Sequence, residues 1–255
     1  MNHITQTEDA LFAEWRKANP CALFRDGVLV PDRYLTSKVR VVFALREANF
    51  RDSQTGDTIQ KAYDLRDEFK EQDPKNSNLA HPFWKQKLAP WCFGIAESAS
   101  FKDAKEIHKN RARCIEYLTR FGFVQLKKMP GNSTIKPAEF VNAVLEGDGG
   151  TFLRRQFEIY EPDIIIACGI SFPKTFDLLT KHVFPGTLIL GKARFEGRCA
   201  MTQTCKSNGG PTFIIETKHP SHRGRREKVY DQLMSDYRQA VELLRQPQEA
   251  AAATN

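Results

Sequence analysis

The chain has 255 residues, 41% of them hydrophobic and 27% charged, which is enough for one large domain with a sizeable core. Its formal net charge of +7 favours a polyanionic partner, although charge alone does not determine a fold. No apolar run approaches the roughly 20 residues of a membrane span, and because the first ten residues are polar we expect no signal peptide. We therefore expect a cytoplasmic protein without a membrane partner.

The N-terminal half alternates apolar and polar segments. A helix is predicted over 8–17. The apolar, β-branched run 39–45 predicts a buried strand, and the polar segment 46–58 predicts a loop at its carboxyl end. Helical patterns follow over 59–72 and 79–98, separated by a cluster of helix-breaking residues.

The C-terminal half continues this alternation. Its expected elements are a basic helix over 104–120, a strand over 123–126, a helix from 136, a strand over 163–168, a helix ending near 179, short strands within 186–216 and a helix over 225–244. Alternating strands and helices predict an α/β fold, here a three-layer sandwich with a mostly parallel central sheet. We expect a single domain over 1–245, a monomer, and a disordered tail over 246–255.

Six cysteines are scattered along the chain without any Cys-x-x-Cys pair. Reduced and mostly buried thiols are the expectation for such a pattern. Cys199 and Cys205 are close enough to share a metal, but no histidine lies at ligand spacing from them. We expect neither a metal nor another cofactor.

Positive charge is concentrated in two segments. Between Lys102 and Lys128 there are eight Lys or Arg residues against three acids, and the second cluster surrounds His219 in the sequence Lys-His-Pro-Ser-His-Arg-Gly-Arg-Arg. This second segment lies between an apolar strand and a long helix, where open α/β folds bind ligands. It predicts either a catalytic histidine beside a phosphate clamp or a structural His-Pro turn at a basic helix N-terminus.

Three strand-end segments carry the remaining candidates for chemistry. The first offers Glu47 and Asn49, the second Gln125 with two lysines, and the third His219. In a parallel sheet all three would open onto one edge. An acid, an amide and an imidazole beside basic patches are typical of a site that hydrolyses a nucleotide.

The order of these segments resembles the uracil-DNA glycosylase superfamily. In that family a water-positioning Gly-x-Asp/Asn-Pro loop, a base-reading Asn, an apolar Asp-x-Ile-Ile-x-x-Gly strand and a late His-Pro-Ser motif follow one another. Here their places are taken by Glu47-Ala48-Asn49, Gln125, Asp163–Gly169 and His219-Pro220-Ser221. The resemblance covers roughly residues 38–240, and His-Pro-Ser is its most specific element.

The resemblance implies a monofunctional DNA glycosylase that extrudes the target nucleotide. His219 would stabilise the leaving base, Glu47 would orient water with help from Asn49, Gln125 would read the base edge and Phe50 would stack on it. The remaining residues would contact the DNA backbone: Ser221, Arg223, Arg225, Arg226, Lys127 and Lys128.

Two departures from the family pattern concern the substrate. Ala48 and Asn49 replace the Pro and, in the uracil-specific branch, the Tyr that excludes thymine. A small Asn49 leaves that side of the pocket open, which favours a bulkier 5-substituted pyrimidine. The pattern is compatible with the bacterial antiviral branch that removes glucosylated hydroxymethylcytosine from phage DNA. The alternatives are a uracil-excising repair enzyme, a catalytically silent DNA-binding relative, or a metal-dependent α/β hydrolase of nucleotides or phosphoesters.

Overall fold

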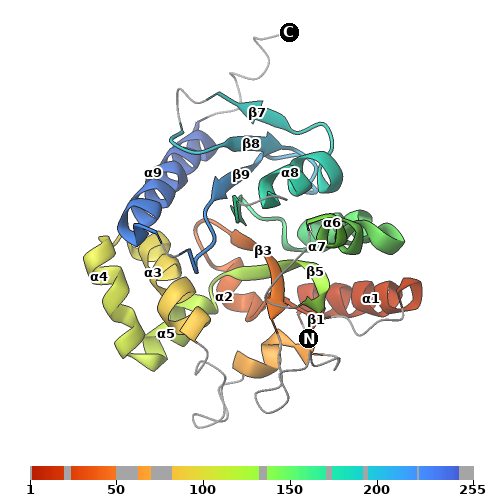
Figure 1. Cartoon of the computed structure of the whole chain (residues 1–255), viewed down its shortest axis with the longest axis horizontal. Helices are drawn as coiled ribbons and strands as arrows, with labels where there is room; N and C mark the ends of the chain where they lie inside the picture. Colours follow the sequence, from red (N-terminus) through yellow and green to blue (C-terminus); the bar gives the residue numbers. More distant parts are fainter. Residues whose placement is uncertain are drawn as a thin grey trace.

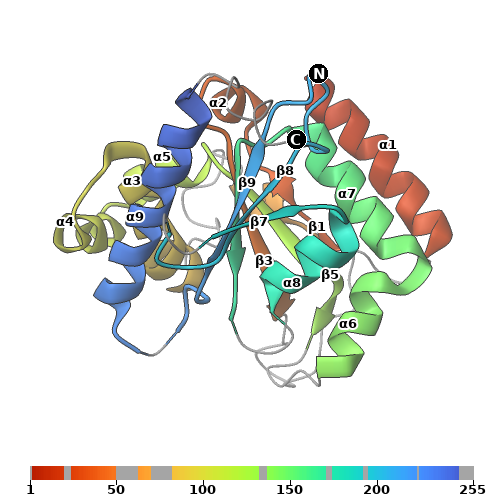
Figure 2. The ribbon, with the colours of Figure 1, turned by 90° about the horizontal axis from the view of Figure 1, so that it is seen from above.

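The computed structural model describes residues 2–19, 24–49, 63–69, 82–131, 137–170, 174–191, 195–222 and 224–246. Helices cover both faces of one central sheet, so the chain forms the three layers expected of an α/β sandwich (Figures 1 and 2). Of the tail expected at 246–255, only Gln246 is described, as the C-cap of the last helix. The rest of that tail lies outside the described residues.

The central sheet has seven strands in the order β2-β5-β3-β6-β9-β8-β7. Its strands are β2 (Gly27–Val28), β3 (Val41–Asn49), β5 (Gly122–Gly131), β6 (Ile164–Cys168), β7 (Leu188–Leu190), β8 (Cys199–Thr202) and β9 (Thr212–Thr217). The four central strands β5, β3, β6 and β9 are parallel, whereas β2, β8 and β7 join the edges in antiparallel pairings. The sheet is therefore mixed, with a parallel centre. A separate parallel pair joins β1 (Phe24–Arg25) to β4 (Tyr63–Asp64).

One face of the sheet buries the larger of two apolar cores, which we call the first core. It collects side chains such as Phe43, Phe123 and Ile215 beneath Trp91 and Tyr230. The covering elements are η3 (Trp84–Leu88), α3 (Ala89–Glu97), α4 (Phe101–Glu106), η4 (Ile107–Lys109), α5 (Arg111–Leu118) and α9 (Arg226–Arg245). The short η1 (Leu65–Phe69) adds Leu65 and Phe69 to the same core.

The opposite face buries the second core, which includes Val42, Val124 and Ile165. Its covering elements are α1 (His3–Ala18), α2 (Pro31–Leu35), α6 (Pro137–Leu145), α7 (Gly149–Tyr160), α8 (Thr175–Leu178) and η6 (Leu179–Val183), with η5 (Glu146–Asp148) linking α6 to α7. Successive strand residues alternate between the two cores because side chains of a strand point to opposite faces. This alternation determines which residues of a strand share a face of the sheet.

Two strands continue beyond their predicted ends. β3 extends to Asn49 and β5 to Gly131, and they stay paired with Glu47 opposite Lys127 and Asn49 opposite Gly131. The expectation of a loop immediately after residue 45 is therefore wrong, and β5 continues beyond the expected strand end at residue 126. Outside the core these two strands have polar residues, so the apolar pattern that identifies a buried strand ends there. Their backbones nevertheless continue to hydrogen-bond to each other.

The expected helix over 104–120 is divided. Asn110 ends η4 and caps α5, and its side chain accepts a hydrogen bond from the amide of Arg113. Ser100 caps α4 in the same way. Asn and Ser compete with the helical backbone through such bonds and therefore favour helix starts over helix interiors.

The connections of the parallel strands change direction between β3 and β6. β3 connects to β5 on one side through α3, α4 and α5 on the first-core face, whereas β6 connects to β9 on the other side with α8 on the second-core face. Ligands of open α/β sheets bind outside the carboxyl ends of the strands at such a switch point. The carboxyl ends of β3 and β6 are therefore the first place to look for a site.

Candidate functional site

The carboxyl edge of the parallel strands brings the sequence-predicted segments together. Glu47 on β3 pairs with Lys127 on β5, and Cys168 on β6 pairs with Thr217 on β9. The amide of Gly169 also donates to the carbonyl of Thr217 over 2.8 Å, which ties the end of β6 to the segment leading into His219. The fold therefore places the backbone of three candidate segments along one sheet edge (Figure 1).

His219 lies two residues beyond β9, on the face of the first core. Its ring stacks on Phe83, with ring centroids 5.5 Å apart and planes 18° from parallel, and Phe83 itself packs against that core. The amide of Ser221 donates to Nδ1 of His219 over 3.2 Å. In a neutral ring whose Nδ1 accepts, the proton resides on Nε2. The His-Pro-Ser turn thus presents an Nε2–H donor.

The protonation state of His219 is set by its surroundings. Burial and, as the smaller cause, the positive charge of Arg46 together lower its pKa from 6.5 to about 4. The histidine is consequently neutral at physiological pH. A neutral imidazole donates one hydrogen bond without bringing a buried charge into the site.

Arg46 was not singled out by the sequence. It follows the apolar run of β3 directly, and its guanidinium lies over the ring of Phe140 on α6, 4.9 Å from the centroid. The aliphatic part of the Arg46 side chain lies beside Gly169. A Cβ atom added to Gly169 would lie 3.3 Å from Cδ of Arg46, and the φ angle of Gly169 is +121°. Glycine satisfies both requirements. The sequence feature that could have identified Arg46 is its position as a cation at the carboxyl end of a buried apolar run.

Gln125 on β5 is only 4% exposed. The backbone amide of Gln125 donates to Oδ2 of Asp26 over 2.6 Å. Its side-chain oxygen Oε1, in contrast, has no hydrogen-bond partner among the described residues. Leaving a buried acceptor unpaired costs about 1–3 kcal/mol, and such groups call for an explanation. By strand alternation from Phe123, this carboxamide belongs to the face on which His219 lies.

Four predicted residues are described incompletely or not at all. Glu47 and Asn49 belong to β3 by their backbones, with a shift of register between them. Their side chains are not described. Phe50 and Arg223 lie outside the described residues.

The two adjacent lysines of β5 have different surroundings. Lys127 is partly exposed at the sheet edge. Lys128 is 3% exposed, and its ammonium contacts Oδ1 of Asp26 at 2.5 Å, within a network that includes Gln156. The prediction of a DNA contact for Lys128 is therefore corrected: its charge is directed into the second-core side of the protein and neutralised there.

The remaining predicted DNA contacts are exposed. Ser221, Arg225 and Arg226 all lie at the surface around the first turn of α9. Nη2 of Arg226 donates to the carbonyl of Gln86 over 2.9 Å and so connects this turn to η3. Behind His219 lies a cavity of only about 10 Å³, which Lys87, Arg226 and His222 also line. This volume holds at most one water, so the cavity does not accommodate a nucleobase.

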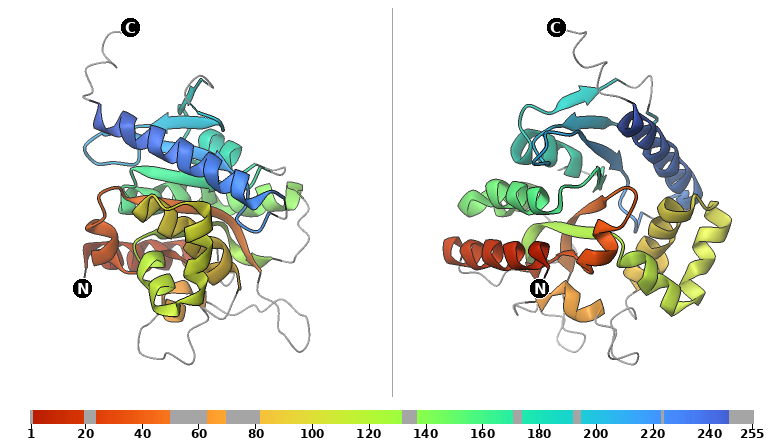
Figure 3. Two further views of the ribbon diagram at one scale, coloured as in Figure 1. Left: turned by 90° about the vertical axis from the view of Figure 1, so that its left-hand side faces the viewer. Right: turned by 180° about the vertical axis from the view of Figure 1, so that it is seen from behind.

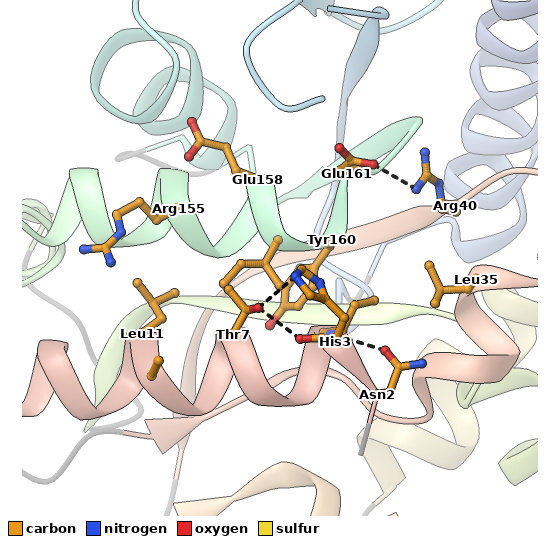
Figure 4. Close-up of a pocket in the computed structure, with 13 residues that line it drawn as sticks. Asn2, His3, Thr7, Leu11, Leu35, Arg40, Arg155, Glu158, Tyr160 and Glu161 are labelled. Carbon is orange, nitrogen blue, oxygen red and sulfur yellow. Dashed lines mark hydrogen bonds and ion pairs between the residues drawn. The ribbon is translucent and has the colours of Figure 1, made fainter. Parts of the chain in front are cut away.

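A larger cavity of about 550 Å³ lies at the opposite, amino edge of the sheet, between α1 and α7 (Figure 4). Its polar side chains bond to one another: Arg40 pairs with Glu161 at 3.5 Å, and His3 contacts Thr7 at 3.5 Å. Arg155 at its rim pairs with Glu14. We assign it no ligand, since it lies away from the carboxyl ends of the strands.

The described part of the chain holds no group of three or more His, Cys, Asp or Glu side chains arranged around a metal position. Among the described residues, five cysteines are free and buried, and burial raises the pKa of each thiol: Cys92, Cys114, Cys168, Cys199 and Cys205. Such thiols are poor nucleophiles. Within the described ranges, no helix has the length and apolar character of a membrane span.

Neither the protein-family models nor the curated proteins contain a match to this chain.

Proposed function

We propose that the protein is a DNA glycosylase that hydrolyses the N-glycosidic bond of an extruded modified pyrimidine. The observation that carries this proposal is the state of His219: a neutral ring at the carboxyl edge of the sheet, with Nδ1 occupied by the Ser221 amide and the proton on Nε2. The unsatisfied carboxamide oxygen of Gln125 on the same sheet face supports a ligand with a complementary donor. The His-Pro-Ser resemblance to the uracil-DNA glycosylase superfamily supports the reaction class.

The reaction requires charge stabilisation on two sides of the bond that breaks. Cleavage leaves negative charge on the base and positive charge on the sugar. Nε2–H of His219 donates to the base oxygen on which the negative charge develops, and a preorganised donor of this kind contributes roughly 100- to 1000-fold in rate. Glu47, whose backbone lies at the end of β3, has the chemistry to orient water or to stabilise the cationic sugar.

The target nucleotide must leave the duplex before this chemistry can occur, because the bond is inaccessible in a stacked helix. Extrusion costs a few kcal/mol. Contacts between phosphates and the exposed arginines around α9 offset this cost and are indifferent to base sequence. We propose a 5-substituted pyrimidine as the base, with glucosylated hydroxymethylcytosine of phage DNA as the leading case, because Ala48 and Asn49 stand in place of the bulky family residues.

The test compares duplexes that contain uracil, hydroxymethylcytosine or glucosylated hydroxymethylcytosine. After incubation with the protein, hot alkali converts each abasic site into a strand break. We expect breaks at the glucosylated base with the wild type, a loss of roughly 100-fold or more with His219→Ala, and no loss with His182→Ala, an exposed histidine on η6.

Each other outcome has a definite meaning. Breaks only at uracil would show that the substrate is uracil and not the proposed modified base. DNA binding without breaks in any duplex would show that the protein binds DNA without catalysing base release. Equal activity of the wild type and the His219→Ala variant would contradict the role given to this histidine.

A further inference from the structure

The two basic segments of the sequence meet in one groove. α4 contributes Phe101 and Lys105, and the first turn of α9 contributes Arg225 and Lys228, more than 100 residues later in the chain. The groove between them encloses about 730 Å³. α4 and the start of α9 lie side by side in views from opposite sides (Figures 1 and 3).

Three cations of this groove form no ion pair with its described acidic residues. Although Glu196, Glu227 and Asp231 also line it, none of them forms an ion pair with Lys105, Arg225 or Lys228 in the part of the chain that the structure describes. The first turn of α9 has no side-chain cap, because Arg225 occupies the N-cap position without a hydrogen bond from its side chain. Amide donors at such a turn favour an anion.

A second observation points to the same kind of ligand. The small cavity behind His219 adjoins the groove, since Phe101 and Arg226 line both. It brings Lys87 and Arg226 together with no carboxylate in its lining. Burial and the nearby charge of Arg226 both lower the pKa of Lys87. Two cations that repel each other in this way are stabilised by an anion between them.

We propose that Lys87, Lys105, Arg225, Arg226 and Lys228 form one phosphate track for a DNA strand. The track leads from the outer end of α4, across the start of α9, to His219. It carries the backbone phosphates that flank the extruded nucleotide, and its identification with DNA rests on the proposed function. Because the contacts are to phosphates, the track binds unmodified DNA as well as modified DNA.

The test uses two triple variants that lose the same charge. The track variant is Lys87→Gln/Lys105→Gln/Arg225→Gln, and the control variant is Arg16→Gln/Lys17→Gln/Lys181→Gln, whose residues are exposed on α1 and η6. Binding of a short fluorescein-labelled duplex of unmodified DNA is measured by anisotropy over a range of KCl concentrations. Thermal unfolding of both variants checks that they fold.

For each phosphate contact that is lost, the slope of log affinity against log salt falls by about 0.9. We expect the track variant to lose between two and three units of slope and at least about tenfold in affinity at low salt, while the control keeps the wild-type slope. If the two variants have equal salt slopes and equal affinities for DNA, the proposal of a phosphate track is wrong.

Base release by the same proteins separates this inference from the proposed function. A wild type that releases the base, together with equal binding by both variants, would refute the track alone. A wild type that binds DNA through the track but releases no base from any duplex would refute the glycosylase and leave the track. A wild type that binds no DNA would refute both.

Discussion

The amide of Ser221 and Nδ1 of His219 are joined by a hydrogen bond of 3.2 Å within a single turn. This bond fixes the proton of the neutral ring on Nε2, and Pro220 between the two residues restricts the backbone that forms it. The turn therefore determines which ring nitrogen can donate to a substrate.

The first prediction concerns pH. Since burial and Arg46 lower the pKa of His219 to about 4, the ring stays neutral well below its ordinary pKa of 6.5. We expect base release to persist at pH 5 and to fall only as the pH approaches about 4, in single-turnover assays. An acid limb near pH 6.5 would show that the histidine is not held neutral by its surroundings.

The same pKa has a consequence for stability. Below pH 6.5 the unfolded chain binds a proton at His219 that the folded chain does not bind until about pH 4. The contribution of His219 to the free energy of unfolding is therefore full above pH 6.5 and is lost as the pH falls through this window. The difference in stability between the wild type and His219→Gln, followed by urea unfolding at several pH values, should show this fall.

The second prediction concerns Arg46. Because its charge contributes to the lowered pKa of His219, Arg46→Gln should raise that pKa toward 6.5. The acid limb of base release should move upward with it, and NMR titration of the ring should report the same shift. Arg16→Gln, on the exposed surface of α1, should leave both unchanged; an unshifted titration in Arg46→Gln would exclude the electrostatic coupling.

The third prediction separates function from stability at Gln125. Its buried carboxamide oxygen is unsatisfied in the described residues, so Gln125→Leu removes an unpaired acceptor while filling similar space. We expect the free energy of unfolding to stay the same or to rise by about 1 kcal/mol, while kcat/KM for base release falls. A loss of stability of more than about 2 kcal/mol would show that the carboxamide supports the fold.

The fourth prediction contrasts the two lysines of β5. Lys128→Met leaves Asp26 buried without its ion-pair partner, which should cost about 3–5 kcal/mol of stability and leave the salt dependence of DNA binding unchanged. Lys127→Gln should do the opposite: it should keep the stability and lower the salt slope by about 0.9. Urea unfolding and anisotropy titrations measure the two effects. A lower salt slope in Lys128→Met would restore the original prediction of a phosphate contact.

Sequence patterns predicted the centre of the sheet well because its strands have apolar inner segments. Residues 41–45 of β3, all of β6 and all of β9 are buried, and such runs are recognisable without knowledge of their neighbours. β1, β2 and β4 have two residues each and exist through their partners alone. The outer ends of β3 and β5 are polar and likewise depend on pairing with each other.

The site was predictable where a local motif determines the chemistry, as at His219. Lys128 was assigned wrongly because it lies beyond the strand expected over 123–126, and outside a strand two adjacent lysines can face the same way. In a strand they must face opposite sides. Arg46 and Lys87 acquire their significance from His219 and Arg226, which are distant in sequence, and no local pattern reports such proximity.

The most direct measurement of the central claim is mass spectrometry of the bases freed from DNA of different modification states. The wild type should release a single 5-substituted pyrimidine and leave an abasic site, and His219→Ala should release almost none while still binding the DNA. The account is contradicted if no DNA yields a free base, or if the His219→Ala variant releases the base as fast as the wild type.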